Sequence, residues 1–546
     1  RGGYDAVRAT ARQRQQAMLK AAETGIPSFG RRIGLEGFDA SIVQDLVDDH
    51  IMRDVEPGVS LGFAHDVFFE WTLFQVARSK GARWLDLVQS AGEPPFFGRI
   101  VALLSQQAFE RDEGWDAGLT SLENASARSQ WKRAWLIAPF SSPLFVIHQS
   151  RIDGAFARSP ERLRRLLLGF QAERTQPNPL VLGGFAGDNL DRLARLRLAD
   201  QLSWPSDYLA WGRLLGWFLP RCETLPPVLV ADTLPVFEAW IAALGQTPGM
   251  VPKAMKEAIG EWLKAVEIHR HPEHWQEILR RDGQSGWDAI SDDELRQVEQ
   301  SLLFQFFLAT TADPDLQRGY FEHLLQMDTR MRESCSVVSS HASLIHPAAV
   351  AAAVDLCLAA ILQDLPEDEE RRSRHFGGGS SPFEWGRLSL DEGGAQYFPP
   401  SPAREPFRTF FQKAPDEALR LVRGLCNHAM EAWRQLNRRD RQFGMTPRPM
   451  LVNFPWGNQT FWGNTRVYGF YRGIFGPHIL DSALMALEEW AFSELNRGRS
   501  GDEVIRDVVG ENECCAVLGI ALGVALQANA ATPVSLALLA SAHLWR

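Results

Sequence analysis

Residues 39–77, DASIVQDLVDDHIMRDVEPGVSLGFAHDVFFEWTLFQVA, hold the pattern that decides the fold of the N-terminal part of this chain. Asp39–Asp49 predicts a short helix, because its apolar residues recur at helical spacing on one face. Two strands, Ile51–Val55 and Val59–Ala64, follow around a Pro-Gly turn, and the helix His65–Ala77 comes directly after them. The residues predicted to form the apolar face of the first helix are Ile42, Val43, Leu46 and Val47.

This order of helix, two-stranded hairpin and helix is the arrangement of a winged-helix domain, which we expect over residues 36–79. Apolar residues alternate in the second strand (Val59, Leu61, Phe63), so one of its faces is expected to be buried. Residues 1–35 are expected to form a helical lead-in to this domain.

Most of the remaining sequence predicts helices of roughly 10–20 residues, separated by short turns that carry Pro or Gly. Ser159 is a typical helix cap, and Pro160 suits the first turn of the helix that follows. Strand alternation is scarce, which is typical of stacked helical hairpins. We therefore predict a mainly α protein, in which an irregular HEAT-like or TPR-like α-solenoid follows the winged helix. The other predicted helices include 207–218, 234–244, 255–268, 292–308, 416–436 and 479–495.

The predicted array has two parts, residues 80–370 and residues 416–546, with a Gly- and Pro-rich insertion over 371–415 between them. A loop over 447–473 carries many aromatic residues and contains Trp-Gly-Asn twice. Its side chains could fill a core, form a protein-binding surface or stack on sugar rings. Its candidate partner-binding residues are Trp456, Trp462, Arg466, Tyr468, Tyr471 and Arg472.

Composition and charge exclude several classes of protein. The chain has 546 residues and a net charge of −10, which argues against direct binding of nucleic acid through a basic surface. Six cysteines without a C-x-x-C pair predict buried free thiols in a reducing, cytoplasmic setting. Residues 516–541 carry no charge, but Thr532 and Pro533 break the run, so two short buried helices are expected and no membrane span.

The stretch Phe63–Trp71, FAHDVFFEW, resembles the F-x-H-D motif at the end of the winged helix of STAND NTPases. These signal-transduction ATPases include innate-immune receptors and bacterial antiviral proteins of the Avs type. Leu46-Val47 and Ile51–Arg53 share in this resemblance. Farther along, Phe461–Gly473, Ser482–Glu488 and Asn512–Gly523 resemble the helical C-terminal part of long bacterial defence ATPases.

The resemblance implies ATP or ADP, with Mg, held between a P-loop domain and the winged helix, with the motif histidine on the phosphates. In this chain that histidine is His65, and Asp66 is expected to cap the helix that follows. No lysine in the chain follows a glycine, so a P-loop is absent and these residues alone are expected to bind no nucleotide. The ATPase region and any effector would then precede Arg1, with residues 1–35 leading in from it.

The resemblance also implies a role in anti-phage defence. The helical array would recognise a foreign phage protein, and recognition would lead to nucleotide-dependent homo-oligomerisation. The sequence shows no catalytic motif of its own, and the cluster His269, His271 and His274 is expected to be a solvated loop and not a metal site.

Three alternatives remain at this point. An all-helical toroid acting on carbohydrate would draw on the 18 Trp residues and on carboxylates such as Glu384 and Asp391. A helical protein-binding scaffold is the second. A winged-helix DNA regulator is disfavoured, because the helix Asp39–Asp49 carries four Asp and no Lys or Arg.

Overall fold

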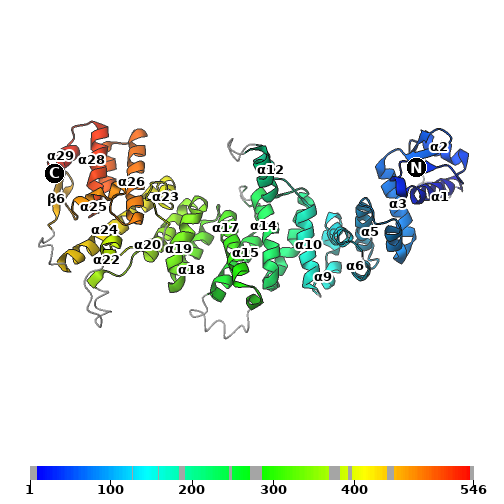
Figure 1. Ribbon diagram of the computed structural model, residues 1–546, viewed down its shortest axis with the longest axis horizontal. Helices are drawn as coiled ribbons and strands as arrows, with labels where there is room; N and C mark the ends of the chain where they lie inside the picture. The colour runs from blue at the N-terminus through cyan, green and yellow to red at the C-terminus, as the bar shows by residue number, and fades with distance from the viewer. Residues whose placement is uncertain are drawn as a thin grey trace. The chain divides into compact units, whose positions relative to one another are not determined.

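A computed structural model describes residues 9–125, 127–157, 159–183, 191–244, 247, 249–270, 286–367, 382–391, 396–439 and 448–541. The described residues are mainly helical, as the sequence predicts (Figure 1). The chain divides into two compact units, Arg1–Leu244 and Gly245–Arg546. This division falls inside the range 80–370, which the sequence predicts to be one helical array.

Unit 1 begins with a small mixed α/β part and continues as helices. Its helices are α1 (Ala9–Thr24), η1 (Ile26–Ser28), α2 (Ala40–Asp48), α3 (Asp66–Ser79), η2 (Gly81–Arg83), α4 (Trp84–Ser90), α5 (Phe97–Arg111), α6 (Trp115–Asn124), α7 (Ser129–Ile137), η3 (Ala138–Ser141), α8 (Phe145–His148), α9 (Ser150–Ala157), α10 (Pro160–Glu173), α11 (Pro179–Leu182), α12 (Arg192–Gln201), α13 (Tyr208–Phe218), η4 (Leu219–Thr224), η5 (Pro227–Leu229) and α14 (Val230–Leu244). Its strands are β1 (Ile33–Gly34), β2 (Met52–Glu56), β3 (Ser60–Phe63), β4 (Thr175–Gln176) and β5 (Trp204–Pro205).

A three-stranded antiparallel sheet of order β1-β3-β2 joins α2 to α3. The expected alternation in β3 is wrong, because all four of its residues are buried and Val59 lies outside the strand, 60% exposed. Strand β1 pairs with the other edge of β3, so β3 is the central strand of the sheet. Helix α2 packs on α1, where Arg14 forms an ion pair with Asp49. One of the acidic residues of this helical segment, Asp49, is therefore paired with an arginine of the same chain.

The helical part of unit 1 is built around tryptophans whose indole nitrogens are hydrogen-bonded. Trp84 and Trp135 stack with ring centroids 5.4 Å apart. Trp115 Nε1 donates to Ser105 Oγ at 2.9 Å, and Trp135 Nε1 donates to the Trp115 carbonyl at 3.1 Å. A buried indole N–H without a partner would be costly, so these bonds fix the positions of the rings.

Unit 2 is helical apart from one β-hairpin and two isolated bridges among its described residues. Its helices are α15 (Lys253–Arg270), η7 (Gly286–Ala289), α17 (Asp292–Ala309), α18 (Pro314–Leu325), α19 (Asp328–His341), η8 (Ala342–Leu344), η9 (Pro347–Ala349), α20 (Val350–Ile361), α22 (Pro382–Arg387), α23 (Phe407–Lys413), α24 (Pro415–Arg439), α25 (Thr465–Tyr468), η11 (Gly469–Arg472), α26 (His478–Asn496), α27 (Gly501–Val509), α28 (Ala516–Ala528) and α29 (Pro533–Leu539). The hairpin consists of β6 (Met450–Phe454) and β7 (Gly457–Phe461).

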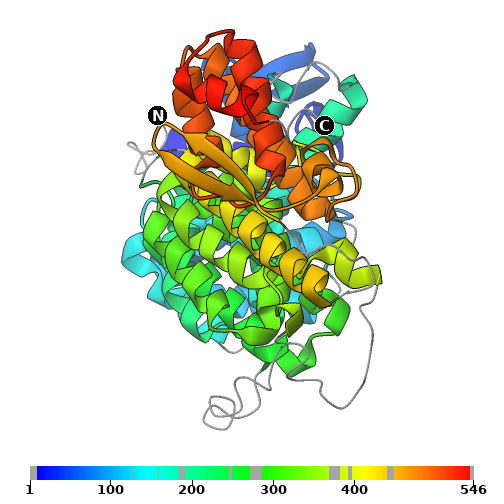
Figure 2. The ribbon, with the colours of Figure 1, turned by 90° about the vertical axis from the view of Figure 1, so that its left-hand side faces the viewer.

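Helices of unit 2 pack mainly against helices that are close in sequence, such as α15 on α17, α19 on α20, and α27 on α28. Local packing of this kind is what stacked helical hairpins need, although the irregular solenoid itself stays a prediction. The hairpin β6–β7 (orange in Figure 2) lies beside α29 (red). The uncharged run forms α28 and α29, with Thr532 capping α29 and Pro533 in its first turn, as the sequence predicts.

The described part of the insertion 371–415 is less irregular than the sequence suggests. Helix α23 lies within it and packs on α24 and α26, with Phe407 and Phe410 fully buried. Leu390 forms a bridge with Leu362 at the end of α20. The aromatic residues of α23 are therefore part of the core of unit 2, whereas Phe398 of the same insertion is 61% exposed.

One described helical segment, Pro227–Leu244, is apolar and long enough to span a membrane by length and composition, and 44% of it is buried.

Candidate functional site

His65 lies at the N-terminus of α3, directly after strand β3. It occupies the N-cap position in an extended conformation (φ −136°), and its side chain makes no capping hydrogen bond. The imidazole is exposed, and its ring centroid lies 5.9 Å from that of Phe68. A phosphate approaching this helix end would meet both the ring and the free amides of the first turn.

Asp66 does not cap α3, which corrects the expectation from the sequence. His65 holds the cap position, and Asp66 is the first helical residue, with an exposed side chain. A carboxylate in the first turn favours the helix dipole, but it opposes an anion at the same place. His65 and backbone amides would therefore have to outweigh this charge if the helix end contacts a phosphate.

The aromatic segment 447–473 forms the hairpin β6–β7, α25 and η11, and residue 447 lies outside the described residues. Trp456 stacks on Phe454 at 4.7 Å, and the Arg506 guanidinium lies 4.8 Å from the Trp456 ring. Trp462 is covered in the same way by Arg434, at 4.4 Å. The Trp462 amide donates to the Glu513 carbonyl at 2.6 Å, and the Cys515 amide donates to the Trp462 carbonyl at 2.9 Å.

The two tyrosines of this segment also have intramolecular partners. Tyr468 and Tyr471 pack edge to face at 5.8 Å, and burial raises the pKa of Tyr468 to about 12. Arg472 lies over Tyr471 and pairs with Glu488 at 3.2 Å. Arg466 lies 5.4 Å from the ring of Phe475, which is 66% exposed. The four predicted aromatic residues are half-buried, so Arg466 and Arg472 are the two of the six whose side chains face solvent.

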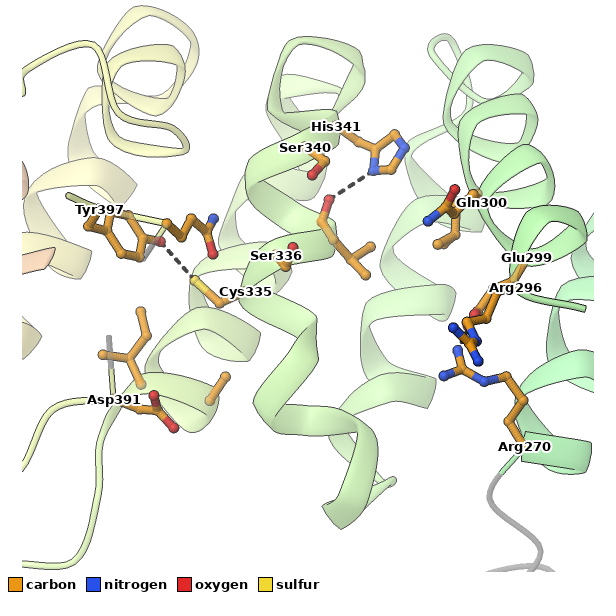
Figure 3. Close-up of a pocket in the computed structure, with 15 residues that line it drawn as sticks. Arg270, Arg296, Glu299, Gln300, Cys335, Ser336, Ser340, His341, Asp391 and Tyr397 are labelled. Atoms are coloured by element: carbon orange, nitrogen blue, oxygen red, sulfur yellow. Dashed lines mark hydrogen bonds and ion pairs between the residues drawn. The ribbon is translucent and has the colours of Figure 1, made fainter. Parts of the chain in front are cut away.

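A cavity of about 760 Å³, lined by both polar and apolar residues, lies within unit 2 (Figure 3). Helix α19 contributes Cys335, Ser336, Ser340 and His341, and α15 and α17 contribute charged residues from one side. Asp391 and Tyr397 come from the segment after α20 and lie on the other side in Figure 3. The remaining lining residues are Arg270, Arg296, Glu299, Gln300, Leu303, Val337, Ala360, Ile361 and Gln396.

The cavity has one charged side and one side with a thiol and a phenol. Arg270 forms an ion pair with Glu299, a nearly buried carboxylate on α17. Across the cavity, Tyr397 Oη lies 3.1 Å from Cys335 Sγ (Figure 3). His341 Nδ1 contacts the Val337 carbonyl at 2.9 Å, and its ring stacks on Phe307 at 4.8 Å. These groups can bind a polar molecule by hydrogen bonds at several points.

Burial of His341 leads to a prediction for the dependence of stability on pH. Burial lowers the pKa of His341 below its ordinary value of 6.5, because desolvation disfavours the imidazolium. Below about pH 6.5 the unfolded chain therefore binds a proton that the folded chain does not, so the free energy of unfolding falls as pH decreases. We expect His341→Gln to weaken this fall between pH 7 and 5, as measured by urea unfolding of the purified chain.

His50→Asn is the control for this experiment, because His50 is exposed and its φ of 56° is one that asparagine tolerates. Its pH dependence should match that of the wild type. An unchanged slope in His341→Gln would contradict the assignment to His341.

The alternative of an enzyme acting on carbohydrate named two carboxylates, and one of them lies in this cavity. Asp391 lines the cavity, whereas Glu384, on α22, is not among the lining residues. Among the described residues, no group of three or more His, Cys, Asp or Glu side chains is placed to hold a metal ion. His271 and His274 lie outside these residues, and His269 contacts Asp288 at 3.5 Å.

Sequence reasoning missed the cluster formed by Cys335, Tyr397, Arg270 and Glu299. More than 120 residues separate Arg270 from Tyr397, and no motif connects them. Their proximity follows from the packing of α15, α17, α19 and α20, which a single sequence does not encode as a pattern. No protein-family model matches the chain, and no curated protein matches it.

Proposed function

We propose that this chain is the regulatory and ligand-sensing part of a STAND-type ATPase that acts in the bacterial cytoplasm in antiviral defence. The observation that carries the proposal is the N-terminal part of unit 1. There α2, the sheet β1-β3-β2 and α3 follow one another, and the motif FAHD places His65 at the exposed start of α3. Helices of the kind expected in a sensor array follow directly.

In this proposal the sheet and its helices form a winged helix that touches nucleotide through His65. ATP or ADP, with Mg, would be bound mainly by a P-loop domain outside these residues. The nucleotide supplies the energy difference between a closed and an open state of the protein. His65 would hold a phosphate oxygen, and its loss would favour the open state.

The helical array would bind a phage protein, and this binding would favour the open state and homo-oligomerisation. A ligand can shift such an equilibrium only as far as its affinities for the two states differ. The exposed ends of Arg466 and Arg472, next to the aromatic residues of η11, are of the types that dominate protein-protein contacts.

The first test is the sequence encoded upstream of Arg1. A G-x-x-x-x-G-K-[ST] motif followed by an acidic strand end would support the proposal. A reading frame that starts just before Arg1, with no ATPase ahead of it, would contradict the proposal and leave the helical scaffold as the leading alternative.

The second test uses the full-length protein and replaces His65 with alanine. Loss of one hydrogen bond to a charged phosphate costs about 1.5–3 kcal/mol, so retained ADP should bind roughly 10–100-fold more weakly. Bound nucleotide is measured by chromatography after denaturation, and phage resistance is measured in cells. His50→Asn is the control, because His50 is an exposed histidine in the same part of unit 1 and its φ of 56° is one that asparagine tolerates; it should behave as wild type. Equal nucleotide retention in the two variants would remove His65 from the proposed site.

A further inference from the structure

Cys335 is the one cysteine among the residues that line the cavity of unit 2. Its side chain belongs to α19 and is 6% exposed. Tyr397 Oη lies 3.1 Å from its sulfur (Figure 3). Ser339 Oγ lies 3.5 Å from the same phenol oxygen. Cys357, on the neighbouring helix α20, interacts with the Cys335 sulfur from a fully buried position. The sulfur of Cys335 therefore has a phenol oxygen and a second thiol as polar neighbours, and the cavity lies beside it.

The two thiols are unequal in their chemistry. A hydrogen bond from Cys357, followed by those from Tyr397 and Ser339, lowers the pKa of Cys335 against the opposing effect of burial. The same contact and burial raise the pKa of Cys357 well above its ordinary value, so Cys357 keeps its proton. Cys335 lines the cavity, whereas Cys357 is fully buried and does not. Cys335 is therefore the thiol that an entering peroxide reaches, and Cys357 is the thiol that can respond to it.

We propose that Cys335 is an oxidation site for hydrogen peroxide or small organic peroxides that enter the cavity, with Cys357 as its resolving thiol. The Cys335 thiolate attacks one peroxide oxygen. The S–O bond forms as the O–O bond breaks, and the leaving hydroxide takes a proton to become water. The product on the protein is a sulfenic acid at Cys335.

The second step joins α19 to α20. The sulfur of Cys357 attacks the sulfenic sulfur of Cys335, the S–S bond forms, and the S–O bond breaks. The hydroxide released combines with the proton of the Cys357 thiol and leaves as water. In total, two thiols are oxidised to one disulfide, and one hydrogen peroxide is reduced to two waters. The two helices already pack against each other, so the link would form within one packed pair.

The other cysteines provide an internal comparison. Cys222 is buried in unit 1, donates to the Phe218 carbonyl at 3.8 Å, and has its pKa raised by burial to about 12. Cys426 and Cys515 also have their pKa values raised, with burial and neighbouring thiols as the causes. These thiols should react with peroxide more slowly than Cys335.

The test exposes the folded full chain to hydrogen peroxide and maps each cysteine by peptide mass spectrometry. In the wild type we expect a Cys335–Cys357 disulfide, seen as the loss of two hydrogen atoms and reversed by a thiol reductant. In Cys357→Ser, we expect a sulfenic acid at Cys335 that dimedone traps. Tyr397→Phe removes one donor and should slow the reaction of Cys335 about tenfold.

Cys222→Ser is the matched control and should form the disulfide at the wild-type rate. The mapping of the wild type needs no variant, so a substitution that impairs folding does not prevent the test. Oxidation of Cys335 no faster than that of Cys222 would overturn the proposal. So would a stable sulfenic acid at Cys335 in the wild type, because Cys357 would then not resolve it.

Discussion

Gly463→Ala is expected to destabilise unit 2 by about 4 kcal/mol, from backbone strain of about 1–3 kcal/mol and overpacking of similar size. Gly463 has a φ of +136°, a backbone conformation that residues with a Cβ rarely adopt. A Cβ there would lie 2.4 Å from Cys515 Sγ and 2.8 Å from Val467 Cγ1. Urea unfolding followed by tryptophan fluorescence measures the loss.

The chain supplies its own control in the other Trp-Gly-Asn sequence. Gly457 has a φ of +132°, but a Cβ there meets nothing within 4 Å. Gly457→Ala should therefore show the strain alone, about 1–3 kcal/mol, and the difference between the two variants measures the clash. Equal losses would contradict the packing of Gly463 against Cys515.

His323→Ala is expected to cost about 3–5 kcal/mol, because it removes a polar partner from a carboxylate with no exposed surface. Glu267, on α15, receives a hydrogen bond from Tyr320 Oη at 2.7 Å, and its other oxygen lies 3.3 Å from His323 Nε2. Both partners lie on α18. Loss of the histidine leaves the carboxylate with fewer polar neighbours in a dry interior. Denaturant unfolding of the purified chain measures the effect.

Two further variants separate loss of the partner from loss of volume. Glu267→Gln in the His323→Ala background removes the buried charge and should recover part of the stability. Glu261→Gln, on the same helix but with a side chain 72% exposed, should change the free energy of unfolding by less than about 0.5 kcal/mol. A double variant no more stable than His323→Ala alone would show that the charge is not the source of the cost.

Helix positions were predictable where the sequence carries both a capping residue and apolar residues at helical spacing. Ser159 accepts a hydrogen bond from the Arg162 amide, and Pro160 begins α10, as expected. Strand β1 was not predictable, because a strand of two residues is too short to show an alternation of apolar and polar side chains. Its absence from the prediction is also why the sheet was expected to have two strands instead of three.

The candidate sites were less predictable than the helices. A buried and an exposed aromatic residue look the same in sequence. The sequence therefore did not decide whether the aromatic residues of segment 447–473 fill the core or form a binding surface. The structure gives Trp456 and Trp462 intramolecular cation–π partners, Arg506 and Arg434, from helices far along the chain. The six cysteines were expected to be free and buried, and this is confirmed. The grouping of Cys335 and Cys357 near Tyr397 depends on tertiary packing alone.

The backbone bonds of Trp462 have a consequence for how this protein is made. Its amide and carbonyl are satisfied by Glu513 and Cys515, which leave the ribosome about fifty residues later. Until they do, the backbone N–H and C=O of Trp462, just after β7, lack these partners, and the indole rings nearby are exposed. The last part of unit 2 should therefore close only after Glu513 and Cys515 have been made, and a nascent chain paused before Glu513 would be a natural client for chaperones that bind aromatic surfaces.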